Sequence, residues 1–170
     1  MVRDLVDTFM GQARMQLADR GEIAPAVLVC HGTEAEVLPV NPSSGRQKDQ
    51  VAFVGRELVK KLDAHTVVMI TEIWALRRDL TPAQYEELRA SYERVEDMPG
   101  RIECVAINVE TRDGQVWHAQ AEILRQGRAV RTGPVEYHDM SGLEMAGRFA
   151  GWFAPRREVP DALPESGAKP

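Results

Sequence analysis

The stretch that decides the fold is residues 101–124, RIECVAINVETRDGQVWHAQAEIL. Two runs of alternating apolar and polar residues flank the turn sequence Arg112-Asp113-Gly114. Asp-Gly between such runs is a strong hairpin signal, because glycine adopts the positive φ of the turn without a Cβ clash. Residues 101–124 therefore predict a β-hairpin.

The faces of this hairpin depend on the register between its two strands. A two-residue turn would place apolar residues opposite charged ones. A three-residue loop with Gly114 as a G1 bulge would instead align two apolar sets and place His118 opposite Asn108 on a polar face. The apolar sets are Val105, Ile107 and Val109 on the first strand and Trp117, Ala119, Ala121 and Ile123 on the second. We therefore expect the bulged hairpin.

Four segments show the helical period, with apolar residues three and four positions apart. These segments are residues 2–20, 49–63, 81–96 and 142–153. The third opens with Thr81-Pro82-Ala83-Gln84, in which a threonine cap, a proline at the first position and a glutamine form a capping box. Its stripe of Tyr85, Leu88, Tyr92 and Val95 is typical of a helix that caps a core, with a partner surface as the alternative.

The strands outside the hairpin are predicted at residues 26–31, 34–40, 65–75 and 128–137. Residues 67–70 are apolar on both faces, which places their strand centrally in the sheet. The order α-β-β-α-β-α-β-β-β-α predicts an α+β fold, with a mostly antiparallel sheet of five or six strands and helices packed on one face. We assign residues 1–154 to a single domain and expect the proline-rich residues 155–170 to be disordered.

Composition restricts the class of protein. The chain has 170 residues, 44% hydrophobic and 28% charged, and a net charge of −5, which disfavours nucleic-acid binding. The longest apolar run, residues 26–29, is far shorter than the roughly 20 residues that span a bilayer. Residues 1–4 include an acid and no apolar run, so we expect no secretory signal and a cytoplasmic protein.

Cys30 and Cys104 lie in segments with a strand pattern, which predicts buried thiols. A disulfide between adjacent strands is the alternative.

Glu72 is the strongest candidate among the carboxylates for a functional residue. It lies late in the strand that we place centrally, where a charged group must be near the strand end, paired or functional. Glu103 lies on a neighbouring predicted strand, so the two could share a proton or hold Mg²⁺ as a catalytic pair. The favoured alternative is a structural ion pair with Arg77, Arg78 or Arg101.

The loop before the second helix is a candidate anion site. Small hydroxyl groups and two cations precede helical N–H groups there, an arrangement that accepts anions. The candidate residues are Ser43, Ser44, Arg46 and Lys48, and the alternative is an ordinary surface loop. The segment lacks the spacing of a nucleotide-binding P-loop.

Histidine and cysteine spacing gives no nucleophile or metal signature. Cys30 and His31 are adjacent on a strand, so they point to opposite faces and cannot form a dyad with each other. The four histidines are widely separated, so we expect no metal and no cofactor. The sequence thus favours a non-catalytic interaction or regulatory module that binds a protein partner or forms a homodimer. The alternatives are a small hydrolase using Glu72 with Glu103 or a histidine, and a binder of a small anion at residues 43–48.

Overall fold

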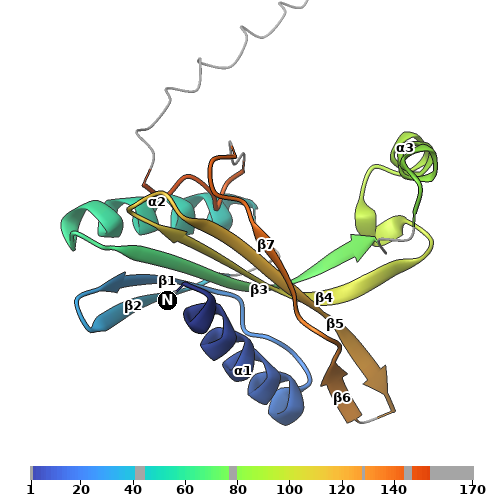
Figure 1. Ribbon diagram of the computed structural model, residues 1–170, viewed down its shortest axis with the longest axis horizontal. Helices are drawn as coiled ribbons and strands as arrows, with labels where there is room; N and C mark the ends of the chain where they lie inside the picture. Colours follow the sequence, from blue (N-terminus) through green and yellow to red (C-terminus); the bar gives the residue numbers. More distant parts are fainter. Residues whose placement is uncertain (1, 41–44, 77–79, 128, 144–146, 154–170) are drawn as a thin grey trace, which may run out of the picture.

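A computed structural model describes residues 2–40, 45–76, 80–127, 129–143 and 147–153 (Figure 1). Its helices are α1 (Val2–Arg20), α2 (Gly45–Lys61), α3 (Pro82–Ser91) and the short 3-10 helix η1 (Val95–Asp97). Its strands are β1 (Ala26–His31), β2 (Glu34–Pro39), β3 (Thr66–Leu76), β4 (Arg101–Thr111), β5 (Val116–Gln126), β6 (Ala129–Thr132) and β7 (Glu136–Asp139). No helix in these ranges is long and apolar enough to cross a membrane.

The strands form one antiparallel sheet in the order β2-β1-β3-β4-β5, and β6 and β7 both pair with β5. This arrangement confirms the predicted α+β class and the mostly antiparallel sheet. The sheet has seven strands because the predicted strand 128–137 is divided between β6 and β7. Gly133 and Pro134 lie at the division, where proline cannot donate a hydrogen bond to the ladder.

The hairpin of β4 and β5 has the predicted register. Val105 pairs with Ala121, Ile107 with Ala119, and Val109 with Trp117. Thr111 N donates to Gln115 O at 2.9 Å, which leaves a three-residue loop, and Gly114 has a φ of 87°. The positive φ explains why glycine occupies this position.

Helix α1 covers one face of the sheet and seals it. Its apolar stripe packs on alternate residues of β3, β4 and β5, and the helix lies against that face in Figure 1. The fully buried members from the sheet include Val68, Val105, Ile107, Val109 and Ala119, each 0% exposed. This packing forms the larger of two cores, which we call the α1 core.

Helix α2 packs on the opposite face, which corrects the expectation that the helices share one face. The strand residues that alternate with those of the α1 core point to the opposite face. Among them, Val27, Val29 and Val67 form a second cluster with Val59 of α2. We call this cluster the α2 core. Strands β1 and β3 contribute to both cores, as expected for continuous apolar runs, which indicate burial on both faces.

The predicted helix over residues 142–153 is wrong for the residues that the structure describes. Residues 142–143 and 147–153 form turns, and residues 144–146 lie outside the described ranges. Gly142, Gly147 and Gly151 have φ values of 80°, 143° and 65°, which an α-helix does not accommodate. Residues 147–153, the C-terminal segment, instead place Trp152 in the α2 core at 4% exposure. The predicted disorder of residues 155–170 concerns residues outside the described ranges.

Candidate functional site

A row of polar side chains occupies the part of the α2-side sheet surface that lies between α2 and α3. Opposed residues of antiparallel strands project on the same face, so the register places His118 beside both Asn108 and His138, and Gln120 beside Glu136. We call these five residues the polar face. In Figure 1, α2 and α3 lie on the same side of the sheet at opposite ends of it. All five side chains are half-buried.

The polar face is a connected network. His118 Nδ1 lies 2.7 Å from Asn108 Oδ1, and its Nε2 lies 3.3 Å from Gln120 Oε1. Gln120 Nε2 donates to Glu136 Oε2 at 3.1 Å, and the His118 and His138 ring centroids are 5.8 Å apart. Burial lowers the pKa of His118 below its usual 6.5. The strand register and this short contact confirm the expected position of His118 opposite Asn108.

A pocket of about 560 Å³ adjoins the polar face beneath α3. Its lining residues are Ala75, Leu76, Leu80, Pro82, Tyr85, Val95 and Gln120. Gln120 thus belongs both to this α3 pocket and to the polar network. Apolar walls with a few convergent polar groups are typical of ligand-binding sites.

Helix α3 forms a rim of this pocket rather than a cap on the core. The predicted capping box is present, because Gln84 N donates to Thr81 Oγ1 at 3.3 Å and Thr81 N donates to Gln84 Oε1 at 2.8 Å. None of the residues of α3 is fully buried, and Tyr85 and Tyr92 are 42% and 37% exposed. The expectation that this stripe caps the core is therefore wrong, and its alternative, a partner surface, stays a prediction.

Glu72 and Glu103 lie together on the α1 face, near the end of α1. Their residues are diagonal neighbours, since Glu72 pairs with Val105 on β4, two positions from Glu103. Glu72 Oε1 accepts the Ile23 backbone N–H at 2.6 Å. The cationic partner is Arg125, which donates to the two Glu103 oxygens at 2.8 and 2.9 Å.

The environments of the two carboxyl groups separate their pKa values. Burial raises the pKa of Glu72, whereas the Arg125 guanidinium holds the pKa of Glu103 below its usual value. The neighbouring Glu103 carboxylate also raises the pKa of Glu72. Arg125 further donates to Gly21 O at 2.5 Å. These contacts connect the turn after α1 to the sheet, and the ion pair among them is that of Arg125 with Glu103.

Arg101, one of the three predicted partners of Glu72, makes other contacts in the structure. Arg101 donates to Met98 O at 3.3 Å and lies 5.2 Å from the Trp74 ring centroid. Arg77 and Arg78 lie outside the described residues.

A comparison with protein-family models identifies the family of this chain. Residues 1–162 match the model described as bacteriophage lambda protein ea47. The chain belongs to the ea47 family. No curated protein and no solved structure matches the chain. The ea47 match includes every helix and strand described above, and therefore both the polar face and the Glu72–Glu103 pair.

The predicted anion loop of this ea47 family member is only partly described. Ser43 and Ser44 lie outside the described residues. Arg46 and Lys48 lie in the first turn of α2, where Arg46 is exposed and Lys48 is half-buried. Anion binding at this loop stays a prediction.

Both cysteines are free thiols. Cys104 is buried and Cys30 half-buried, and β3 separates their strands, so the alternative of a disulfide is wrong. Burial raises the pKa of both thiols, that of Cys104 to about 11. His31 Nε2 is buried and has no hydrogen-bond partner among the described residues. Within the same residues, no group of three or more His, Cys, Asp or Glu side chains is placed to hold a metal ion.

Sequence reasoning missed two parts of the polar face, Glu136 and His138, and the role of Gln120. The sequence pattern that could have revealed them is the alternation in Glu136-Tyr137-His138. The tyrosine faces α1, and its two neighbours face the other side of the sheet. Reading β7 as a separate strand beside β5 would have brought both residues to His118 and Gln120.

Proposed function

We propose that this ea47 family member is a non-catalytic binding module, and that the polar face with the α3 pocket is its interaction surface. The observation that carries the proposal is the half-buried network of five side chains from three strands, which continues into an apolar pocket through Gln120.

The contrast between the two sides of the sheet supports this choice. On the α1 side, the central residues of β3 and β4 are sealed beneath the helix. On the other side, the polar face lies between α2 and α3 with its side chains accessible. Tyr85 and Tyr92 stand exposed at its rim, and tyrosine is enriched at protein interfaces.

The charge of this surface favours a protein partner. Glu122 and Glu136 project on this side of the sheet, and the whole chain carries a charge of −5. An acidic surface repels the phosphate backbone of nucleic acids. It complements a protein surface that presents cationic or N–H groups.

Self-association is tested first, by sedimentation velocity over a range of protein concentrations. The variant Gln120→Arg places a bulky cation in the polar network, and Met15→Arg is the matched control, because Met15 is 62% exposed on α1. Assembly that Gln120→Arg abolishes and Met15→Arg preserves identifies a homodimer through this surface. Assembly that survives in both variants contradicts the proposal.

A monomeric wild type is tested with cross-linked lysate of the source cells and quantitative mass spectrometry. The proposal expects a protein that the wild type and Met15→Arg retain and Gln120→Arg loses. Identical sets of proteins on all three baits contradict it.

The second candidate function is a small hydrolase that uses Glu72 with Glu103. Two neighbouring carboxyl groups with separated pKa values favour it, because such pairs supply a general acid and a general base. A panel of chromogenic esters, phosphoesters and glycosides tests this function. Turnover that both Glu72→Gln and Glu103→Gln abolish supports it, and no turnover by the wild type contradicts it for these substrate classes.

A further inference from the structure

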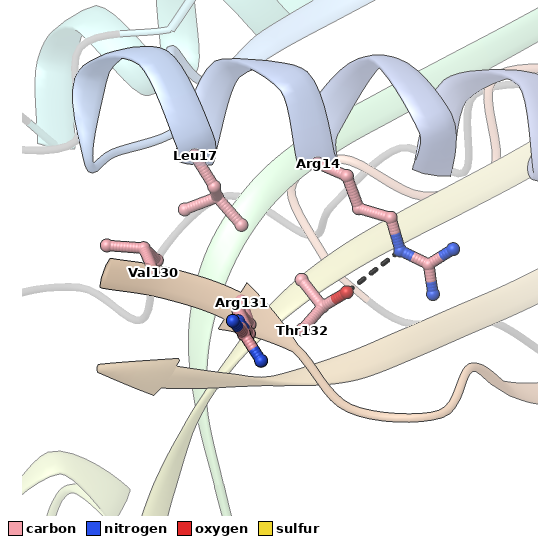
Figure 2. Close-up of a pocket in the computed structure, with 5 residues that line it drawn as sticks. All are labelled: Arg14, Leu17, Val130, Arg131 and Thr132. Atoms are coloured by element: carbon pink, nitrogen blue, oxygen red, sulfur yellow. Dashed lines mark hydrogen bonds between the residues drawn. The ribbon is translucent and has the colours of Figure 1, made fainter. Parts of the chain in front are cut away.

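A second cavity lies on the other side of the sheet, between α1 and β6, and no function discussed above uses it (Figure 2). Its volume is about 300 Å³, at the small end of the range for ligand sites. It is lined by Arg14, Leu17, Val130, Arg131 and Thr132. We call it the α1–β6 cleft.

The polar end of the cleft is a positioned guanidinium group. Arg14 Nε donates to Thr132 Oγ1 at 2.8 Å, the contact drawn as a dashed line in Figure 2. This is the sole hydrogen bond of Arg14 within the described part of the chain, so the donors on its two Nη atoms remain for a ligand. Thr132 Oγ1 accepts from Arg14 and keeps its own O–H proton to donate.

Asp7, an acidic residue of the same helix, is engaged elsewhere. Asp7, two turns before Arg14 on α1, accepts a hydrogen bond from the Tyr137 hydroxyl group. None of the residues that line the cleft is acidic. The local charge at Arg14 is therefore not neutralised by a lining carboxylate.

The opposite end of the cleft is apolar. Leu17 is 1% exposed, and Val130 is half-buried against the α1 core. Arg131 contributes its main chain, because neighbouring strand residues point to opposite faces. Figure 2 accordingly shows its guanidinium group directed away from α1.

We infer that the α1–β6 cleft binds a small carboxylate with a short aliphatic body. The carboxylate accepts from the Arg14 Nη atoms and from the Thr132 hydroxyl group, and the aliphatic chain lies against Val130, above the buried Leu17. Charge-assisted hydrogen bonds to guanidinium groups are the strong class of such bonds and favour carboxylates geometrically. The cleft is small and open to solvent at Arg14, so the expected dissociation constant is on the order of millimolar.

The probe is hexanoate, titrated into the ¹⁵N-labelled protein and followed by amide chemical shifts. Hexanol and inorganic phosphate are titrated in parallel as controls. Hexanol carries the aliphatic chain without a negative charge, and phosphate carries a negative charge without an aliphatic chain. We expect saturable shifts around α1 and β6 with hexanoate, and weaker binding of the other two probes. Equal binding of hexanol or of phosphate overturns the inference, as does the absence of saturable binding of hexanoate.

Arg14→Gln tests the anchoring residue, and Arg20→Gln, at the exposed end of the same helix, is the matched control. Loss of charge-assisted hydrogen bonds predicts a roughly 10- to 100-fold weaker hexanoate affinity for Arg14→Gln. Thr132→Val, which keeps the shape of the side chain, is expected to weaken binding by a smaller factor. Unchanged affinity in Arg14→Gln, with the fold intact by amide spectra, overturns the inference.

Discussion

Glu110 and Trp152 lie 42 residues apart in the sequence, and Glu110 Oε2 accepts the Trp152 backbone N–H at 2.9 Å. The other carboxylate oxygen, Oε1, accepts the Gly151 N–H at 2.9 Å. Arg56 of α2 completes the attachment, because it donates to Arg148 O and Ala150 O and lies 5.2 Å from the Trp152 ring centroid. One buried carboxylate thus fixes the C-terminal segment over the α2 core.

Glu110→Ala leaves two backbone N–H groups without their acceptor. We expect a loss of about 1–3 kcal/mol in the free energy of unfolding, the cost of unsatisfied buried donors. Urea denaturation at pH 7 measures it. Glu36→Ala, at an exposed position of β2, is the control and should change the free energy little. Equal stability of the two variants would show that Glu110 does not hold the segment.

Gly55→Ala tests the contact between α2 and Trp152. A Cβ atom at Gly55 would lie 2.7 Å from Trp152 Cζ3, closer than packed atoms approach. We expect the clash to outweigh the better helix propensity of alanine and to destabilise the protein by about 1–3 kcal/mol. Gly11→Ala is the control, because its Cβ meets nothing within 4 Å, and it should stabilise by roughly 0.5–1 kcal/mol. A stabilised Gly55→Ala variant would contradict this packing.

Glu72→Gln tests the carboxyl pair through its pH dependence. Burial raises the pKa of Glu72 above 4.5 in the folded protein, so its contribution to stability is present below pH 4.5 and lost as the pH rises through the folded pKa. Glutamine mimics the protonated form and still accepts the Ile23 N–H. We expect the variant to exceed the wild type in unfolding free energy at pH 7 and to lose this advantage below pH 4.5, as measured by urea denaturation at several pH values. A loss of stability at pH 7 would instead identify an ionised Glu72 that stabilises the fold through Arg125.

His118 is expected to titrate below its usual pKa of 6.5, because burial in the polar network penalises its charged form. With the folded pKa lowered, the stability from a neutral His118 is present above pH 6.5 and lost as the pH falls through the folded value. The imidazole carbon-bound proton shifts in NMR spectra measure this pKa directly. A value at or above 6.5 would show that the ring is not desolvated.

The anion loop is tested by the melting temperature in the presence of inorganic phosphate. Preferential binding to the folded state raises this temperature, and the double variant Arg46→Ala/Lys48→Ala should remove the effect if the two cations hold the ion. Lys60→Ala/Lys61→Ala at the other end of α2 is the matched control. The same increase in all three proteins, or no increase in the wild type, would contradict the site.

The sequence predicted those parts of the fold that short-range signals specify. The Arg112–Gly114 turn and the alternation around it determined the register of β4 and β5, because only one pairing keeps apolar side chains on a common face. Thr81 and Gln84 likewise predicted the start of α3 from local hydrogen bonding. Both the hairpin register and the start of α3 depend on residues that are close in the sequence, so the sequence pattern is sufficient to predict them.

The errors arose where distant residues decide the structure. The small residues of 142–153 suit a closely packed helix, but Glu110 supplies acceptors for the Gly151 and Trp152 N–H groups, and glycines with positive φ values turn the chain toward them. The ion pair of Glu103 with Arg125 is a different case, because both residues lie on the predicted hairpin of β4 and β5. The predicted register, continued beyond the Cys104–Glu122 pair, already places Arg125 diagonally across from Glu103 on the same face, so the sequence contained this contact.

The two cores on opposite faces of β1 and β3 give the molecule two layers with unequal attachment. The α1 layer is packed by its helix alone across β3, β4 and β5, whereas the α2 layer needs Trp152, near the end of the described chain, besides its own helix. A truncation before Gly147 would therefore remove Trp152 from the α2 core and leave the α1 core intact. In native-state hydrogen exchange, amides of α2 should exchange through a local opening, while those of α1 and the central strands exchange only when the whole domain unfolds.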